Sequence, residues 1–493
     1  MEYKSTRGAE NGVSSAFAIK QGLASDGGLF MPCELPQITQ EEIRTLCGMT
    51  YPQRAAYILG KYLTDYTAEE LRTDCAAAYA TDRFPGGAAP LHKLRDGLHV
   101  LELWHGPTCA FKDMALQIMP HLLSGALEKT GVKGDAFILT ATSGDTGKAA
   151  LEGFHDVPGT RIMVFYPAGG VSPVQEAQMV TQEGGNVRVC AIRGNFDDAQ
   201  TGVKNVFAAC KGKDLHGAVL SSANSINIGR LAPQVVYYFR AYADLVQAGR
   251  IRVGEKVHFV VPTGNFGDIL AGYFAKRMGL PVGRLVCASN ANDVLTEFIS
   301  TGRYDRRRPF YKTTSPSMDI LVSSNLERLL FLLSRDPAYV AELMRQLRED
   351  GVYQLSDQLL AQLKQDFSCG CCDDKGAADV IGRLWREQHY LCDPHTAVAW
   401  SVAEQLSEEL HDTGAPTVVL STASPYKFPA AVLSALGRET GENEFFMMNE
   451  LCRISGVPIP RNLAGLEGRP VLHKDVIDKD AMLDYVLAEV LKK

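Results

Sequence analysis

Lys112 is the residue whose placement in this sequence most favours chemistry, because a lysine amine held in place can bind a carbonyl compound covalently and transfer protons. It lies in LELWHGPTCAFKDMALQ, residues 101–117, where an apolar segment predicts a buried strand and the HGPT segment predicts a turn. Apolar residues then recur at helical spacing from position 111, so Lys112 is expected at the start of a helix. From this local pattern alone, a solvated surface lysine is the simpler interpretation.

A glycine-containing loop, PTGNFGD at residues 262–268, follows an apolar strand and precedes a predicted helix. Free backbone amides and the positive end of the helix dipole can hold a phosphate there, and glycines permit its close approach. An ordinary tight turn is the competing interpretation, and no Walker lysine follows that would indicate a nucleotide. The candidate phosphate-binding residues are Gly264, Asn265, Phe266, Gly267 and Asp268.

A second loop, SGDTG at residues 143–147, places two hydroxyls and several amides at another predicted helix start. This composition suits an anionic group of a substrate, such as a carboxylate. The candidates are Ser143, Asp145 and Thr146, and a helix cap is the competing interpretation of Asp145. Asn224 and Arg230 can add a bidentate phosphate clamp, for which a structural ion pair is the alternative.

The sequence resembles the threonine synthases, which are pyridoxal-phosphate enzymes of the tryptophan synthase β fold group. The matching strings include GPTCAFKD around Lys112, the PTGNFGD and SGDTG loops, and residues 171–179 and 317–321, and the resemblance extends from Ser5 to Phe428. It implies that Lys112 forms a Schiff base with pyridoxal 5'-phosphate and that residues 264–268 hold the cofactor phosphate. It also implies that the loop at residues 143–147 binds substrate.

Thr422 begins the string TASPYKF, which resembles the family's TAHPAKF with Ser424 and Tyr426 in place of the usual histidine and alanine. The resemblance implies that the Thr422 hydroxyl meets the pyridine nitrogen of the cofactor. Considered without the family, a threonine at a strand end is a good β residue or a helix cap. The string DPHTAV at residues 393–398 also matches the family, and a buried His395 that holds a loop explains it equally well.

The implied reaction converts O-phospho-L-homoserine and water to L-threonine and phosphate, by γ-elimination and β-addition in threonine biosynthesis. Lys112 would remove the α-proton of the substrate in this reaction. Two alternatives stay open: a phospho-lyase of the same family that releases 2-oxobutyrate, and a non-catalytic threonine synthase-like binding protein. The sequence does not identify the group that activates the water.

The composition indicates a large globular protein that acts on a small molecule. The chain has 493 residues and a net charge of -7, which argues against a nucleic-acid partner. No apolar run approaches the ~18 residues of a membrane span, and the N-terminus lacks an apolar signal core, so a cytoplasmic protein with no membrane partner is expected. The twelve cysteines are expected to be reduced. Those at positions 369–372 predict a plain loop, with metal binding as the alternative.

The elements that position these residues predict an α/β fold of open, largely parallel sheets covered by helices, as in fold type II pyridoxal-phosphate enzymes. Residues 1–95 predict a mainly helical N-terminal region, in which Thr39 and Thr67 each begin a capping box. Strands, loops and helices then alternate. We expect one α/β domain at residues 96–235, with Lys112 and the 143–147 loop, and a larger one at 236–493, with the 264–268 loop and Thr422. Residues 325–411 are expected to be mainly helical.

Overall fold

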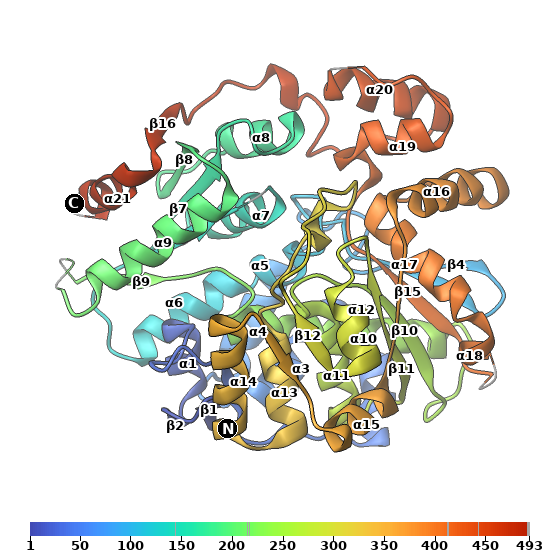
Figure 1. Cartoon of the computed structure of the whole chain (residues 1–493), viewed down its shortest axis with the longest axis horizontal. Coiled ribbons are helices and arrows are strands. Elements are labelled where there is room, and N and C mark those ends of the chain that lie inside the picture. Colours follow the sequence, from blue (N-terminus) through green and yellow to red (C-terminus); the bar gives the residue numbers. More distant parts are fainter. Residues whose placement is uncertain (143, 214, 216, 412–413, 442, 491–493) are drawn as a thin grey trace.

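The computed structural model describes residues 1–142, 144–213, 215, 217–411, 414–441 and 443–490, and Figure 1 shows its helices and strands. The N-terminal region combines four helices with a small antiparallel sheet in the order β2-β1-β3. Both predicted capping boxes are confirmed, because Thr39 and Thr67 accept the amides of Glu42 and Glu70 and these glutamates return the interaction. The elements are β1 (Tyr3–Ser5), β2 (Asn11–Val13), α1 (Ser15–Gln21), β3 (Phe30–Pro32), α2 (Gln40–Cys47), α3 (Tyr51–Tyr62) and α4 (Ala68–Ala78).

A six-stranded sheet in the order β14-β11-β10-β15-β5-β4 forms the larger part of the α/β core, and only β4 and β5 pair antiparallel in it. Alternate residues of β10 face opposite layers: Phe259 and Val261 belong to a hydrophobic core with residues of α10 and α11, and Val260 belongs to a second core with residues of α16 and α17. Helices therefore cover both faces. The strands are β4 (Leu91–Arg95), β5 (Leu98–Glu102), β10 (Val257–Pro262), β11 (Val282–Ser289), β14 (Phe367–Cys371) and β15 (Thr417–Ser421).

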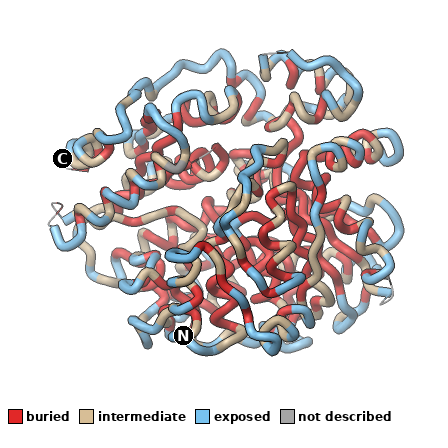
Figure 2. Tube along the Cα trace, in the orientation of Figure 1, coloured by how far each residue is buried: buried red, intermediate tan, exposed pale blue. Residues whose placement is uncertain are grey.

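A second, entirely parallel sheet has the order β16-β8-β7-β6-β9. Phe165 on one face of β7 packs with α9 and α21, while Val164 on the other face joins the main core. Figure 2 shows that buried residues run through both sheets. The strands are β6 (Ala136–Ala141), β7 (Thr160–Pro167), β8 (Val187–Arg193), β9 (Val219–Ser221) and β16 (Asp475–Asp478). The fold is thus α/β with largely parallel sheets covered by helices, as predicted.

The two sheets do not coincide with the predicted ranges 96–235 and 236–493. Strands β4 and β5, which precede Lys112, belong to the six-stranded sheet, because β5 pairs with β15. The C-terminal segment, red in Figure 1, crosses back so that β16 extends the five-stranded sheet beside β8. Strand pairing depends on packing between segments that are distant in sequence. Domain ranges drawn along the sequence therefore do not match the two sheets.

Helices connect and cover these strands, and two short strands interrupt the mainly helical segment at 325–411. The cysteine cluster at 369–372 was expected to be a plain loop, but Cys369 and Cys371 lie in β14, which pairs in parallel with β11. The described residues contain no group of three or more potential ligands placed to hold a metal ion. No helix among them is long and apolar enough to cross a membrane.

The remaining elements are α5 (Asp113–Leu116), α6 (Met119–Lys129), α7 (Asp145–Phe154), α8 (Pro173–Val180), α9 (Phe196–Cys210), α10 (Ile228–Gln247), α11 (Gly267–Met278), α12 (Val294–Thr301), β12 (Arg303–Asp305), η1 (Pro316–Met318), α13 (Leu326–Ser334), α14 (Pro337–Glu349), β13 (Val352–Gln354), α15 (Asp357–Asp366), α16 (Asp374–Gln388), α17 (Pro394–Gln405), α18 (Ser407–His411), η2 (Pro425–Lys427), α19 (Pro429–Ala435), α20 (Glu444–Ser455), η3 (Leu466–Gly468), η4 (Lys479–Ala481) and α21 (Met482–Val490).

Candidate active site

Lys112 follows the carboxyl end of β5 and directly precedes α5, so the predicted strand, turn and helix are confirmed around it. The turn is fixed by the buried Asp113, whose carboxylate accepts the backbone N–H of Thr108 at 2.8 Å and its hydroxyl at 2.7 Å. Gly106 is required there, because a Cβ at this position would lie 2.5 Å from Asp113. These contacts determine where the backbone of Lys112 begins the helix.

The Lys112 amine is partly buried, so the surface interpretation is wrong. Its Nζ lies 3.4 Å from the Ser317 hydroxyl and 4.8 Å from the centre of the Phe111 ring. Among the described residues, no carboxylate forms an ion pair with it within 4.0 Å. Burial lowers the pKa of Lys112 below its ordinary value of 10.5, against the nearby Asp145 carboxylate, which raises it. A lysine that releases its proton more readily is better suited to act as a nucleophile or base.

Thr422 lies directly beside the Lys112 segment, although 310 positions separate the two residues in sequence. The Thr422 carbonyl accepts the backbone N–H of Phe111 at 2.8 Å, and Ala110 and Ala423 form an antiparallel bridge. Thr422 is buried, and its hydroxyl has no hydrogen-bond partner within the described part of the chain. The hydroxyl is therefore available to a ligand that enters between these segments.

The 264–268 loop connects β10 to α11, as predicted. Phe266, the residue before α11, is buried and has a φ of 62° in the left-handed region. Asn265 is exposed, while Gly264, Gly267 and Asp268 are buried. Burial raises the pKa of Asp268 to about 6, against the hydrogen bond from the Ile269 amide, which lowers it. Because α11 begins at Gly267, its first amides have no hydrogen-bond partner within the helix.

The segment at residues 315–325, which was not among the predicted site residues, packs over this loop. Ser323 donates its hydroxyl to the Gly264 carbonyl at 2.8 Å, and the backbone N–H of Asn325 donates to the Asn265 carbonyl at 3.1 Å. Ser317 lies so close that a Cβ on Gly264 would be 2.7 Å from its carbonyl oxygen. The string at 317–321 matched the family, but nothing in its composition indicated that it would meet the glycine loop.

The donor groups around Gly267 fit a phosphate. A Cβ on Gly267 would find space, with Asn325 Nδ2 at 3.5 Å and Gln234 Nε2 at 3.8 Å. Asn325 Nδ2 is buried without a hydrogen-bond partner, because the other end of this amide faces Arg328. A buried donor left unpaired beside a helix start is what an anion would satisfy. These donors fit the phosphate of pyridoxal phosphate. The Lys112 amine fits its aldehyde, and the free Thr422 hydroxyl fits its ring nitrogen.

The 143–147 loop begins α7 beside the lysine, and its Ser143 lies outside the described residues. Thr146 is half-buried in the first turn of α7, and the nearby Thr142 hydroxyl accepts the amides of Gly144 at 3.0 Å and Gly147 at 2.9 Å. Asp145 was expected to be either a cap or a substrate ligand. The cap interpretation is wrong, because its buried carboxylate lies 2.5 Å from Lys427 Nζ and accepts from another side chain amide at 3.0 Å.

The Asp145 and Lys427 side chains form this ion pair with almost no exposure. Burial on its own raises the pKa of Asp145, but the Lys427 and Lys112 ammonium groups overcome this effect and hold it below its ordinary range. Lys427 also donates to the Thr108 carbonyl at 3.1 Å. Lys427 was not among the predicted site residues, although the family-like string that begins at Thr422 contains it.

Arg230 lies in the first turn of α10, and Asn224 lies in the turn that leads into this helix, as expected. The Arg230 guanidinium is buried, donates to the Ala223 carbonyl at 2.8 Å, and leaves its Nε without a partner. No acidic side chain pairs with it in the described residues, so the structural ion pair is wrong. Burial lowers the pKa of Arg230 to about 10. Asn224 is half-buried, and its carbonyl closes the turn by accepting the Asn227 amide at 3.1 Å.

His395 holds a loop, which was one of the two interpretations of its motif. Its Nδ1 lies 2.6 Å from the Asp393 carboxylate, and its Nε2 accepts the backbone N–H of Ser317 at 3.1 Å. Both side chains are buried. The histidine thus fixes the turn that faces Lys112.

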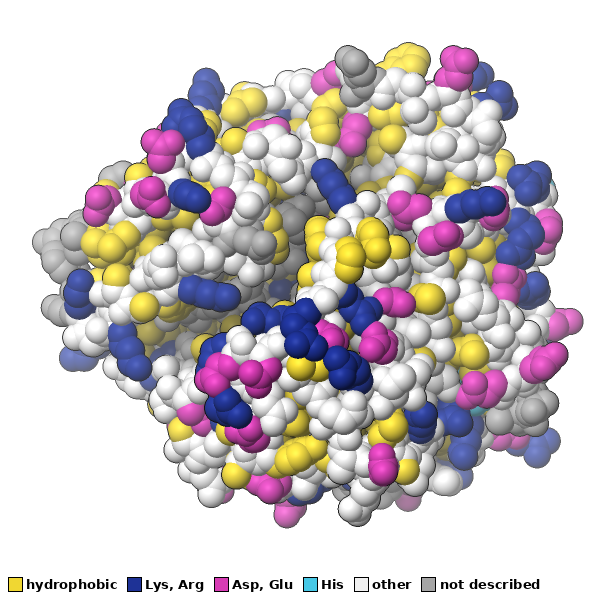
Figure 3. Space-filling view, in the orientation of Figure 1, with side chains coloured by type: hydrophobic (Ala, Val, Ile, Leu, Met, Phe, Trp, Pro, Cys, Tyr) yellow, Lys and Arg dark blue, Asp and Glu magenta, His cyan; other side chains and the backbone are white. Residues whose placement is uncertain are grey.

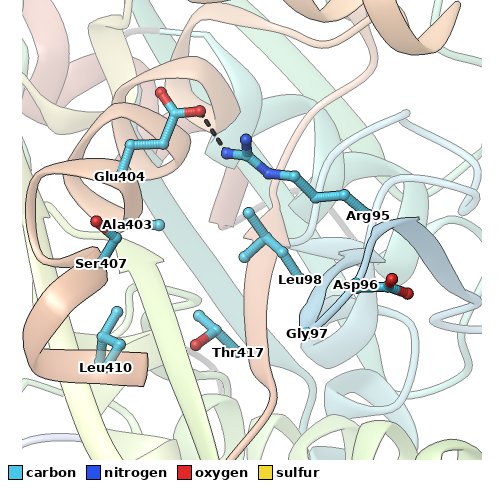
Figure 4. A pocket seen from close by; sticks show the side chains of 9 residues that line it. All are labelled: Arg95, Asp96, Gly97, Leu98, Ala403, Glu404, Ser407, Leu410 and Thr417. Atoms are coloured by element: carbon cyan, nitrogen blue, oxygen red, sulfur yellow. Dashed lines mark hydrogen bonds and ion pairs between the residues drawn. The ribbon is translucent and has the colours of Figure 1, made fainter. Parts of the chain in front are cut away.

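A cavity of about 370 Å³ lies at the opposite end of the six-stranded sheet (Figure 4). Leu98 and Thr417, the first residues of β5 and β15, line it together with the paired side chains of Arg95 and Glu404, which lie 2.5 Å apart. Ligands of parallel α/β sheets bind at the carboxyl ends of the strands, where Lys112 lies.

Figure 3 shows a hollow on the molecular surface between its upper left and lower right parts, with Lys and Arg side chains along the lower rim.

Comparisons with known proteins agree with this arrangement. A family model described as pyridoxal-phosphate dependent enzyme matches residues 85–423, and models of the threonine synthase N terminus and C-terminal region match residues 2–79 and 396–486. A crystal structure of PLP-bound threonine synthase from Brucella melitensis is 40% identical with a TM-score of 0.89, and the match covers 100% of this chain and 99% of that one.

Two curated relatives differ in how much of their own length this chain spans. The threonine synthase of Schizosaccharomyces pombe is 38% identical, and the match covers 90% of this chain and 91% of the relative. Human threonine synthase-like 1 is 40% identical over 89% of this chain, which spans only 61% of the length of that relative.

Proposed function

Because the chain belongs to the threonine synthase family of pyridoxal-phosphate-dependent enzymes, we propose that it converts O-phospho-L-homoserine and water to L-threonine and phosphate. The observation that carries this proposal is the position of the Lys112 amine, which lies between the Thr422 loop and the segment that covers Gly264, without an acidic partner in the described residues. The reaction places the protein in threonine biosynthesis.

The cofactor would be held by four groups of the chain. Lys112 would bind its aldehyde carbon, and the amides from Gly264 to Asp268 would hold its phosphate with the Asn325 side chain amide. The Thr422 hydroxyl would meet the ring nitrogen, as a neutral donor. Bound pyridoxal phosphate supplies an electron sink for charge that develops on the substrate.

The substrate would lie against the start of α7. Ser143 and Thr146 would bind its carboxylate with hydroxyl and amide groups, and Arg230 with Asn224 would bind its phosphate. The unpaired charge of buried Arg230 supports this assignment, because an arginine that lacks an acidic partner gains most from a dianion. Asp145 would act through Lys427, with which it pairs, rather than by direct contact with an anionic substrate.

Lys112 would carry the protons of the reaction. Its lowered pKa supports the role of a base that removes the proton from Cα of the substrate once the amine is free. Asp268 lies near enough to interact electrostatically with Lys112, and its pKa of about 6 suits a carboxyl group that exchanges protons near neutral pH.

We also propose a cytoplasmic location and a small-molecule substrate, without a nucleic-acid or membrane partner. All twelve cysteines are free thiols, which suits a reducing compartment. The net charge of -7 disfavours binding to nucleic acid.

One assay tests the proposal. The purified protein, supplied with pyridoxal phosphate, is incubated with O-phospho-L-homoserine, and threonine, 2-oxobutyrate and phosphate are measured together. Threonine and phosphate in equal amounts are expected. Equal amounts of 2-oxobutyrate and phosphate would identify a phospho-lyase instead, and no phosphate release by fully loaded protein would identify a binding protein.

A further inference from the structure

The Ser317 hydroxyl is the hydrogen-bond partner of the Lys112 amine within the described residues, with 3.4 Å between Nζ and Oγ. It lies in η1, a single turn of 3-10 helix that belongs to the segment over the glycine loop. We propose that Ser317 is a further catalytic residue, which orients the Lys112 amine, and that His395 and Asp393 are positioning residues that hold Ser317 against it. This inference rests on the proposed function, in which Lys112 Nζ is the reacting atom.

The protonation of His395 follows from its two partners. Asp393 accepts from Nδ1 across 2.6 Å, so Nδ1 carries the proton and Nε2 presents its lone pair to the Ser317 backbone N–H at 3.1 Å. Asp393 is itself fixed, because it accepts the backbone amides of His395 at 2.9 Å and Thr396 at 3.2 Å at the start of α17. Both side chains are buried, so water does not compete for these contacts.

Ser317 is also confined from its other side. Its carbonyl oxygen lies where only a glycine fits at position 264, since a Cβ there would approach it to 2.7 Å. The next amide, that of Met318, donates to the Ser315 carbonyl at 3.0 Å, and Asn290 donates to the same carbonyl at 3.3 Å. These contacts hold the backbone of Ser317 in place, so its hydroxyl stays directed at the Lys112 amine.

A hydroxyl is a suitable hydrogen-bond partner for an amine that gains and loses a proton. It holds one donor and two acceptor sites, so it accepts an N–H of the ammonium and can donate to the lone pair after the proton has left. The charged groups that act on Lys112 from the surrounding elements are Asp145, Lys427, Arg230 and Asp268, and they act through space. Ser317 supplies the directional contact that these charges do not.

The test follows the entry of pyridoxal phosphate into the apoprotein, measured as cofactor that borohydride fixes to Lys112 at a series of pH values. For Ser317→Ala we expect uptake to slow by about threefold to tenfold, the worth of one modest hydrogen bond. Its pH profile is expected to shift to lower pH, because the ammonium loses an acceptor. Ser317→Thr keeps the hydroxyl and is expected to restore both.

His395 is tested through Ser317. His395→Leu removes the acceptor of the Ser317 amide and is expected to slow uptake, whereas His395→Gln keeps an acceptor and is expected to retain most of the rate. The double variant Ser317→Ala with His395→Leu is expected to be no slower than Ser317→Ala alone, because the histidine acts through the serine. Circular dichroism and thermal unfolding confirm that each variant is folded.

The outcomes separate the two claims. If borohydride labels Lys112 but Ser317→Ala keeps the wild-type rate and pH profile, this inference is overturned and the proposed function stands. Additive effects in the double variant overturn the positioning role of His395. Label on another lysine in the wild type overturns the proposed function itself.

Discussion

Lys427 and Asp145 form a buried ion pair that joins the two sheets, with 2.5 Å between Nζ and Oδ1. Asp145 begins α7, which packs on the five-stranded sheet, and Lys427 lies in η2, just after β15 of the six-stranded sheet. Burial lowers the pKa of Lys112, and the same carboxylate raises it. Asp145 therefore both joins the two sheets and acts electrostatically on the Lys112 amine.

Asp145→Asn is expected to destabilise the protein by about 3 to 5 kcal/mol, because it leaves the Lys427 ammonium buried without a counter-charge. The measurement is the midpoint of urea unfolding. Asp96→Asn is the matched control, since Asp96 pairs with Lys93 on the surface and its loss is expected to leave the midpoint unchanged. Equal midpoints for the two variants would contradict a structural role for the buried pair.

Lys112→Ala is expected to keep the fold and to lower threonine formation by at least about a thousandfold, because one amine supplies both the covalent anchor and the proton transfer. Pyridoxal phosphate is expected to bind through its phosphate, yet borohydride should no longer fix it to the protein. Lys93→Ala on the surface is the control. Near-normal turnover by Lys112→Ala would end the assignment.

The glycine loop gives two variants with opposite expectations. Gly267→Ala has room for its methyl group and should change stability by less than about 1 kcal/mol, yet this methyl occupies the space that faces Asn325 Nδ2 at 3.5 Å. We expect cofactor affinity to fall about tenfold or more, through lost hydrogen bonds to the phosphate. Gly264→Ala places its methyl 2.7 Å from the Ser317 carbonyl and should lower the unfolding midpoint instead. Equilibrium dialysis measures the affinity; undiminished binding by Gly267→Ala would place the phosphate elsewhere.

Asp113 predicts a pH dependence of stability. Burial raises its pKa to about 7, against the hydrogen bonds from Thr108, which lower it. The folded protein therefore holds this proton where the unfolded chain has lost it, so stability falls as pH rises from about 4 to about 7 and levels off above. From pH 5 to 7 the loss is expected to be roughly 2 to 3 kcal/mol.

The control for this pH dependence is Asp113→Asn, which cannot titrate. Urea unfolding of both proteins at several pH values gives the two slopes. A shallower slope in the variant is expected, and equal slopes would show that other groups cause the effect.

The local features of this protein could be predicted from its sequence. The capping boxes at Thr39 and Thr67 and the helix that starts after Lys112 were predicted correctly, because each depends on contacts within a few residues. The glycine loop between strand and helix followed from the same short-range rules. Alternation of strands and helices was enough to predict the α/β class.

Which distant segments lie side by side depends on long-range packing in the folded chain. Nothing near Lys112 specified that β5 would pair with β15 and bring Thr422 beside it, or that β16 would return to the other sheet. Strand pairing, and with it the contact of Lys427 with Asp145 and of Ser317 with Lys112, is set by the packing of segments hundreds of residues apart. Each of these contacts joins residues whose own neighbours in sequence do not identify the partner. The family resemblance assigned Lys112, the 264–268 loop and Thr422 to one cofactor, and the folded chain added the contacts of Ser317 and Lys427 to that site.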